Sequence, residues 1–280
     1  MTKLIVADVQ LRSGLNREVN IANAAALIRQ AHASGAQLIA TPEMTNVVDT
    51  NPKRLMADLP TEQAAFELPT LAALARELHI WLLVGSMAFK VADRLACNRS
   101  YVFDPQGQIA ARYDKLHMFD VDLAGGERYR ESQLYRPGHR AVVVDAPFGK
   151  LGLTICYDLR FPHLHRALAQ AGAEIISVPA AFTRQTGERH WHTLLRARAI
   201  ETGAFIVAPA QGGRHEDGRA TYGHSLIIHP SGQILAELDS DEPGIIMAEI
   251  DTAACEVARR SIPNLSLEAE FSVETIAAAG

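Results

Sequence analysis

Short apolar runs alternate with helical segments along most of the chain, and this alternation constrains the fold more than any other feature. Residues 3–9 read as a strand, residues from about 17 to 33 have helical apolar spacing that ends at Gly35, and residues 37–40 form another strand. Later strands are expected at 80–84, 141–144, 151–155, 174–178, 205–208 and 245–250, and later helices at 61–78, 162–171 and 188–202. This order predicts a layered α/β domain.

Two hairpin signals interrupt the alternation. Asp104-Pro105-Gln106-Gly107 separates two short apolar runs, and Pro230-Ser231-Gly232 separates another pair. Hairpins join antiparallel strands, so they argue against a purely parallel sheet. We therefore expect a four-layer αββα sandwich, in which two mixed β-sheets pack face to face and the helices lie outside. The strand order stays open, and residues 209–222 are expected to form a polar loop.

Length and composition limit the number of domains and the kinds of partner that can be expected. With 280 residues and 48% apolar content, the chain can form one large core, so we expect a single domain over residues 1–280 with a short tail from about residue 263. The net charge of −5 and the lack of a basic run argue against a nucleic-acid partner. No apolar run approaches the length of a membrane span, and the N-terminal run stops at Asp8, unlike a signal peptide.

Three cysteines, Cys97, Cys156 and Cys255, are too few and too widely spaced for a disulfide framework or a metal-binding pair. This usage predicts a cytoplasmic protein. Only Cys156 stands where a strand passes through a polar turn into a helix. At such a bend, the N–H groups that follow the cysteine can stabilise an anion, which favours a nucleophilic cysteine over a buried structural one.

Glu43 and Lys115 also follow predicted strands directly. Each alone would be interpreted as a solvated surface group. Their coincidence with Cys156 matters, because functional groups of α/β proteins gather just beyond strand ends. If they are site residues without a structural role, Glu43→Gln and Lys115→Met should lower turnover and leave the melting temperature almost unchanged.

The segments around Glu43, Lys115 and Cys156 resemble the three signatures of the nitrilase superfamily of carbon–nitrogen hydrolases. The key positions are 72 and then 41 residues apart, and the resemblance extends from Lys3 to about Ile262. It implies a Glu-Lys-Cys triad with no cofactor or metal, and homodimers or higher even oligomers. A further family glutamate precedes a Pro-Gly pair, and Glu131 is the matching residue.

This resemblance implies hydrolysis of a small linear amide through a cysteine thioester. Glu43 would act as the base and Lys115, with the N–H of Tyr157, as the oxyanion donor. An N-carbamoyl amide hydrolase or an aliphatic nitrilase on the same triad remains an alternative, as does a non-catalytic interaction protein that retains the fold. Histidine pairs such as His190 and His192 lie two residues apart on a helix, a spacing that is poor for a shared metal.

Segments such as Arg160-Phe161-Pro162, His190-Trp191 and 213–225 resemble the superfamily branch that acts on amides of 2-oxo dicarboxylic acids such as deaminated glutathione. The loop from Gly212 to Ser225 carries several donors, and arginines flank the helix before it: Arg214, His215, Arg219, Tyr222 and His224 in the loop, and Arg184 and Arg189 beside the helix. Such donors suit a carboxylate-bearing substrate; the alternative is a solvated surface loop. The candidate substrate-binding residues are Arg184, His190, Arg214 and His215. The chain departs from the branch at His163, where relatives usually carry glutamate, which leaves the polar contacts there open.

Overall fold

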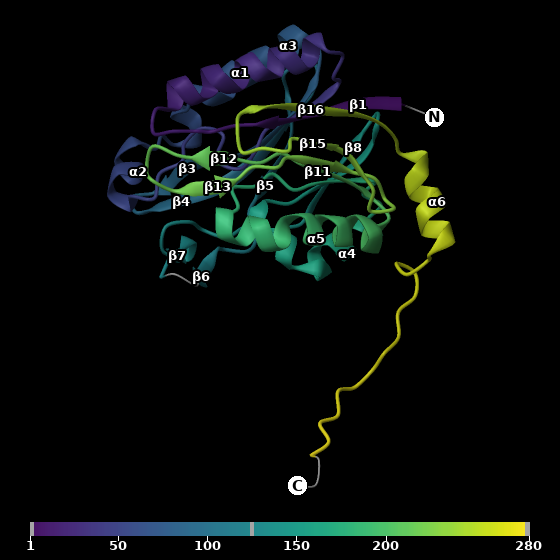
Figure 1. Cartoon of the computed structure of the whole chain (residues 1–280). Coiled ribbons are helices and arrows are strands. Elements are labelled where there is room, and N and C mark those ends of the chain that lie inside the picture. Colours follow the sequence, from purple (N-terminus) through teal and green to yellow (C-terminus); the bar gives the residue numbers. More distant parts are fainter. Residues whose placement is uncertain (1–2, 124–125, 278–280) are drawn as a thin grey trace.

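Two six-stranded sheets pack face to face between outer helices (Figure 1). The computed structural model describes residues 3–123 and 126–277, so the ends of the predicted domain at 1–2 and 278–280 lie outside the described residues. Helices α1 and α3 cover one outer face, and α4 and α5 cover the opposite one. The predicted αββα sandwich is therefore confirmed.

The first sheet has the order β16-β1-β2-β3-β4-β5. Strands β1, β2 and β3 are parallel, whereas the other neighbours are antiparallel. The elements of this half are β1 (Lys3–Gln10), α1 (Arg17–Ala33), β2 (Leu38–Ala40), α3 (Glu67–Leu78), β3 (Trp81–Ala92), β4 (Leu95–Phe103), β5 (Ile109–Asp114) and β16 (Gly244–Asp251).

The second sheet has the order β15-β14-β11-β10-β9-β8. Here β9, β10 and β11 are parallel and the remaining neighbours are antiparallel. The elements of this half are β8 (Val142–Ala146), β9 (Gly149–Leu153), α4 (Pro162–Gln170), β10 (Ile175–Ser177), α5 (Arg184–Thr202), β11 (Phe205–Ala208), β14 (Leu226–Ile228) and β15 (Ile234–Glu237).

The two sheets have the same topology. Read from β16 in one and from β8 in the other, neighbouring strands are antiparallel, parallel, parallel, antiparallel and antiparallel in turn. In each half, helices connect the three parallel strands, with α1 and α3 in the first and α4 and α5 in the second; the first half also has the short helix α2 (Pro52–Asp58) between β2 and β3. The chain is thus an internal structural duplication, which the sequence does not reveal because no short repeat accompanies it.

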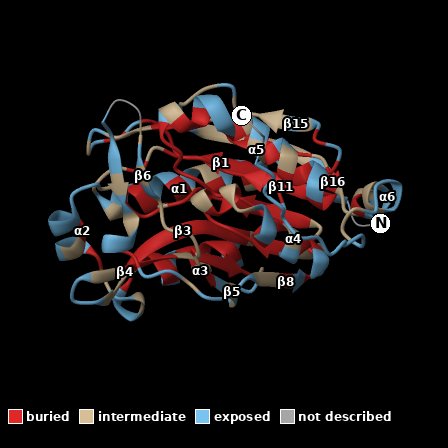
Figure 2. Cartoon of the chain, turned by 90° about the horizontal axis from the view of Figure 1, so that it is seen from below, coloured by how far each residue is buried: buried red, intermediate tan, exposed pale blue. Residues whose placement is uncertain are grey.

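Apolar burial explains the layering. Ile21, Ala24, Ile28 and Ala31 lie three or four residues apart on α1 and bury one stripe against the first sheet. Residues from both sheets share the central core, where Leu83 and Val102 meet Leu153 and Ile176. Figure 2 shows that the buried residues concentrate on the strands and the inward faces of the helices.

Several elements differ from the sequence expectation. The expected loop at 209–222 contains a two-stranded ribbon, and α5 begins four residues earlier than expected because Thr183 caps it through the N–H of Thr186. The additional elements are α2 (Pro52–Asp58), η1 (Glu62–Ala64), β6 (Asp120–Asp122), β7 (Arg128–Arg130), η2 (Glu131–Gln133), η3 (Cys156–Arg160), β12 (Gly212–Arg214), β13 (Ala220–Tyr222) and α6 (Ala253–Ser261).

After α6, residues 263–277 contain no helix or strand and run away from the sheets (Figure 1). Their side chains Leu267, Phe271, Val273 and Ile276 are 69% to 87% exposed. Among the described helices, none is both long and apolar enough to cross a membrane.

Candidate active site

Glu43, Lys115 and Cys156 meet at one end of the two sheets. Glu43 follows β2, Lys115 follows β5 directly, and Cys156 opens η3 after β9. Lys115 and Glu43 are 2% and 4% exposed, and Cys156 is 7% exposed. Strand ends from both sheets thus bring together side chains that are 72 and 41 residues apart in the sequence.

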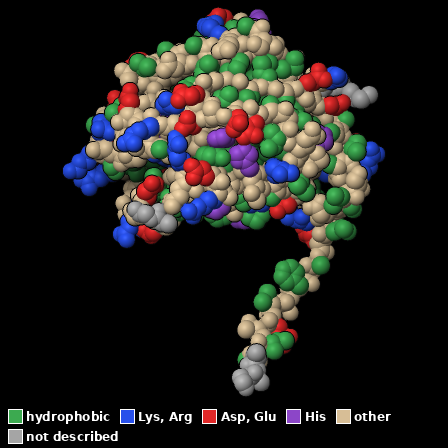
Figure 3. Space-filling model, in the orientation of Figure 1, with side chains coloured by type: hydrophobic (Ala, Val, Ile, Leu, Met, Phe, Trp, Pro, Cys, Tyr) green, Lys and Arg blue, Asp and Glu red, His purple; other side chains and the backbone are tan. Residues whose placement is uncertain are grey.

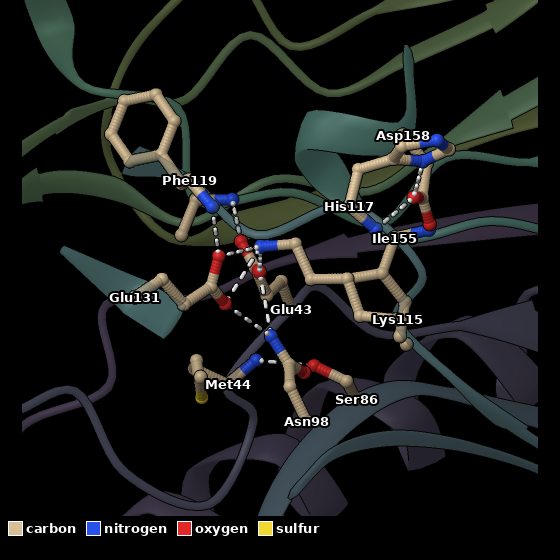
Figure 4. Close-up of polar contacts among 12 residues, drawn as sticks. Glu43, Met44, Ser86, Asn98, Lys115, His117, Phe119, Glu131, Ile155 and Asp158 are labelled. Carbon is tan, nitrogen blue, oxygen red and sulfur yellow. Dashed lines mark hydrogen bonds and ion pairs between the residues drawn. The ribbon is translucent and has the colours of Figure 1, made fainter. Parts of the chain in front are cut away.

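A buried ion cluster holds Lys115 (Figure 4). Its Nζ lies 2.9 Å from Glu43 Oε1 and 2.8 Å from Glu131 Oε2. The main-chain N–H of Ala181 donates to Glu43 Oε2 at 3.0 Å, and that of Phe119 donates to Glu131 Oε2 at 2.6 Å. Both carboxylates are therefore fixed by the backbone as well as by the ammonium.

The cluster carries two carboxylates and one ammonium. Burial opposes ionisation of Glu43, but Lys115 and a hydrogen bond from Cys156 hold the pKa of Glu43 below its usual value. Burial would lower the pKa of Lys115, yet Glu131 and Glu43 raise it well above its usual value. Burial, together with the negative charge of Glu43, raises the pKa of the Cys156 thiol well above its ordinary value. These shifts favour a neutral thiol beside an ionised Glu43 carboxylate.

The backbone at Cys156 is in the left-handed region, with φ 50°. Such a conformation is strained for a residue with a side chain and persists only where surrounding contacts hold it. Asp158 supplies those contacts, because its carboxylate accepts from the N–H of Ile155 at 2.9 Å, the hydroxyl of Tyr113 at 2.7 Å and the N–H of His117 at 3.0 Å. The turn after β9 is thus anchored to the segment that carries Lys115.

These groups open onto a cavity of about 530 Å³. Apolar and aromatic side chains form much of its wall, including Met44, Val47, Phe119, Tyr129, Tyr157 and Phe182. Among the described residues, none accepts the main-chain N–H of Tyr157. A cavity of this size, with a few convergent polar groups, suits a small organic molecule.

Two arginines at the cavity have no carboxylate partner among the described residues: Arg160 and Arg219. Arg160 lies over the rings of Tyr157 and Phe182, at 5.9 and 5.3 Å. Arg219 lies 5.5 Å from the ring of Tyr129, donates through Nη2 to the carbonyl of Ala181, and keeps a buried Nε without a partner in the described structure. Both guanidinium groups can therefore bind an anionic ligand.

The four residues predicted to bind substrate do not line this cavity. Arg184 and Arg214 line a neighbouring depression, and Arg184 forms an ion pair with Asp241. His190 is exposed, and its Nδ1 accepts from Arg160 at 3.3 Å. His215 is buried, and its two ring nitrogens contact the carbonyl of Ser13 and the hydroxyl of Thr221.

His163 also lies outside the cavity lining. It is exposed near the start of α4, and its ring contacts those of His117 and Phe161 edge-on. Its neighbour in the ring stack, His117, in turn contacts Asp158 through Nδ1 at 2.7 Å. His163 thus contacts the ring of His117, and His117 contacts Asp158 in the turn after β9.

Sequence reasoning missed the partners that hold the cluster in place. Asn98 donates to Glu43 Oε1 at 2.9 Å and lies 3.4 Å from Glu131 Oε1. The signal that could have indicated Asn98 is its place as a polar residue inside a largely apolar strand. Arg160 and Asp158 follow Cys156 closely in the sequence, but no local pattern predicts what either side chain contacts.

Cys97 and Cys255 are buried away from the cavity lining. Burial is the main cause that raises the pKa of Cys97 to about 11 and that of Cys255 to about 12. Among the described residues, the side chains grouped closely enough to hold a metal ion are His192, His224 and Glu237, and these too lie outside the cavity lining.

The chain is similar to known proteins over most of its length. Residues 5–260 match the carbon-nitrogen hydrolase family. The deaminated glutathione amidase of Yersinia enterocolitica is 43% identical over 268 residues, which cover 93% of this chain and 91% of that one. The human deaminated glutathione amidase is 38% identical over 264 residues, which cover 92% and 80% of the two chains.

Solved structures show the same architecture. The NitFhit protein of C. elegans superposes with a TM-score of 0.87 at 34% identity, covering 95% of this chain but only 65% of that longer one. Saccharomyces cerevisiae Nit3, a member of branch 10 of the nitrilase superfamily, superposes with a TM-score of 0.83 at 29% identity and covers 93% and 94% of the two chains.

Proposed function

The chain belongs to the carbon–nitrogen hydrolase family and is an amidase, and from this premise we propose that it cleaves a small, linear, carboxylate-bearing amide through a thioester on Cys156. The observation that carries the proposal is the buried cluster of Glu43, Lys115 and Glu131 beside a neutral thiol at the base of the cavity. The shifted pKa values of Glu43, Lys115 and Cys156 favour an ionised carboxylate, an ammonium and a neutral thiol, as the first step requires.

In the first step, Sγ of Cys156 attacks the amide carbonyl while Glu43 takes the thiol proton. The negative charge that develops on the carbonyl oxygen is stabilised by the ammonium of Lys115 and the N–H of Tyr157. Proton transfer at the moment of attack is needed, because the thiol does not ionise by itself near neutral pH. Glu131 acts as a positioning residue, since both of its oxygens contact Lys115 Nζ.

In the second step, the protonated Glu43 gives its proton to the departing nitrogen, and the C–N bond breaks to leave a thioester. Glu43 then takes a proton from a water that attacks the thioester, and collapse of that adduct releases the acid and the thiol. Over the whole cycle, one amide and one water become one carboxylic acid and one amine or ammonia.

The substrate class is inferred from the charge of the cavity. Arg160 and Arg219 are free of carboxylate partners within the described structure and lie beside the reactive groups. Guanidinium groups bind carboxylates through paired hydrogen bonds. Together with the names of the relatives, this supports a 2-oxo dicarboxylic acid amide such as deaminated glutathione as the substrate.

A comparison of four compounds tests this assignment: deaminated glutathione, 2-oxoglutaramate, N-carbamoyl-β-alanine and a neutral aliphatic amide. We expect the highest kcat/KM for deaminated glutathione. Preference for the carbamoyl compound, or for an added aliphatic nitrile, would support the alternative activities on the same three residues. Preference for the neutral amide would contradict the anionic substrate and leave the amidase chemistry standing.

Two further parts of the proposal concern the whole protein. A cytoplasmic location is supported by three buried cysteines, none of which is in a disulfide. A homodimer is supported by exposed apolar side chains that the single chain leaves uncovered, such as Ile262, Phe271 and Val273.

A further inference from the structure

A second group of reactive side chains lies outside the catalytic cavity. His192 comes from α5, His224 from the segment before β14, and Glu237 from the end of β15. One nitrogen of each histidine and a carboxylate oxygen all lie within 4.8 Å of one another. Figure 3 shows histidine side chains beside acidic ones on the face that α5 and β15 share in Figure 1.

The distances within this group are close to those of a ligand set. His192 Nε2 lies 2.8 Å from Glu237 Oε1, and His224 Nδ1 lies 3.3 Å from the same oxygen. Ligands at about 2.0–2.2 Å from a tetrahedral zinc ion lie about 3.3–3.5 Å apart. Small side-chain rotations therefore suffice to place an ion between the three atoms.

A fourth ligand position is open. Asp239 Oδ1 lies 3.8 Å from His224 Nδ1, and its side chain is 93% exposed, so it can turn toward the group. Water can fill the same position, because the side chains of His192, His224 and Glu237 are 31%, 20% and 26% exposed. Two imidazoles with one or two carboxylates are a donor set that suits zinc and similar divalent ions.

The surroundings fix His224 in place. Its backbone is in the left-handed region, with φ 53°, and the indole N–H of Trp191 donates to its carbonyl at 2.7 Å. The ring of Tyr222 stacks on its imidazole, with centroids 4.2 Å apart. A strained backbone that a buried tryptophan holds in place indicates that the imidazole must have one particular position, as a metal ligand does. A surface ion pair alone would not require a strained backbone.

We propose that His192, His224 and Glu237 form a binding site for a divalent transition-metal ion of the zinc type. The ion would link α5 to the β14–β15 hairpin, adding to the contact of His192 with Glu237 and to the hydrogen bond from Arg196 Nε to the carbonyl of Gly232. Because the site lies outside the catalytic cavity, its role is to stabilise this face of the second sheet, and the inference does not depend on the proposed reaction.

The test is calorimetric titration of ZnCl₂ into the full chain, prepared without a histidine tag and carrying Cys156→Ala so that the catalytic thiol cannot bind the metal. We expect one saturable site per chain. In the same background, His192→Gln and Glu237→Gln should each weaken binding by about tenfold to a hundredfold or more. His229→Gln is the matched control, because His229 is half-buried in the same hairpin and its Nδ1 contacts Ser231 instead of a carboxylate.

Thermal unfolding provides a second measurement. Zn²⁺ that binds only the folded chain should raise the melting temperature of the control and leave that of His192→Gln and Glu237→Gln unchanged. Circular dichroism establishes that each variant is folded before titration. Absence of saturable binding, or equal affinity in all variants, would overturn the proposal and leave the group as an ordinary ion pair.

Discussion

In the proposed reaction, Cys156 acts as a neutral nucleophile, Glu43 as an anionic base and Lys115 as a cation. Removal of the thiol tests the role of Cys156 directly. Cys156→Ala should abolish turnover, whereas Cys97→Ala and Cys255→Ala should retain most of it, because burial raises the pKa values of those thiols and neither lines the cavity. Mass spectrometry with a slow substrate should find an adduct on the peptide that contains Cys156. An adduct on either other cysteine would contradict the assignment.

Glu43→Gln removes the base and preserves its shape, so kcat should fall about a hundredfold or more.

The pH profile tests the protonation states. Glu43 has a pKa below its ordinary 4.5, so its carboxylate persists as the pH falls until that lowered pKa is reached. The acid limb of kcat/KM should therefore have its midpoint below 4.5. Because the thiol pKa lies well above 9.0, no rise in kcat/KM should appear as the pH approaches 9.0. Such a rise, measured in wild type, would show that thiolate formation precedes attack.

Lys115→Met requires a different expectation from the one that the sequence suggested. The ammonium lies between two buried carboxylates, so its removal leaves them uncompensated. Breaking a buried ion cluster destabilises a protein by about 3–5 kcal/mol. The variant should lose both activity and thermal stability, as measured by turnover and by thermal unfolding, with exposed Lys53→Met as a control for the loss of a lysine. An unchanged melting temperature would mean that Glu43 and Glu131 do not depend on Lys115.

Arg160→Gln tests the substrate class at the level of one side chain. Loss of a guanidinium that binds a carboxylate should lower kcat/KM for deaminated glutathione by about tenfold or more, since charged hydrogen bonds contribute about 1.5–3 kcal/mol. Hydrolysis of a neutral aliphatic amide should change little. Equal loss on both compounds would indicate that Arg160 supports the cavity wall through Tyr157 and Phe182 instead of binding the substrate.

At the scale of the element, the turn after β9 decides where the nucleophile points. Asp158→Asn replaces an acceptor of several hydrogen bonds with a group that accepts through one oxygen only, so donors such as the Tyr113 hydroxyl lose a partner. We expect a loss of about 1–3 kcal/mol in stability and a lower kcat. Thermal unfolding and steady-state kinetics measure these effects, and Asp145→Asn, at an exposed position, should alter neither.

At the scale of the whole molecule, the proposed homodimer follows from the apolar side chains along residues 263–277. Sedimentation at micromolar concentration should give about twice the 30.5 kDa mass of one chain. Phe271→Ser combined with Val273→Ser should shift the equilibrium toward monomer if this segment contacts the partner chain. A single 30.5 kDa species in the unaltered protein would contradict the dimer.

The sequence by itself determined most of the main strands and helices and singled out Glu43, Lys115 and Cys156. Apolar periodicity and glycine stops depend on local physics, so α1 and β11 have the predicted bounds. Glu43, Lys115 and Cys156 could be singled out because each follows a strand, and strand ends of α/β sheets gather in space.

Only the tertiary structure decided which other groups join them. Asn98, Asp158 and Ala181 lie far from Glu43 in the sequence. Asn98 reaches Glu43 after the first sheet forms, and the bonds of Asp158 to Tyr113 and of Ala181 to Glu43 form only after the two sheets pack. The same reason explains the arginines: Arg184 and Arg214 are as basic as Arg160 and Arg219, but packing aims only the latter pair at the cavity. Periodicity reports which face of an element is buried, whereas the direction of a polar side chain depends on neighbours that the local sequence does not contain.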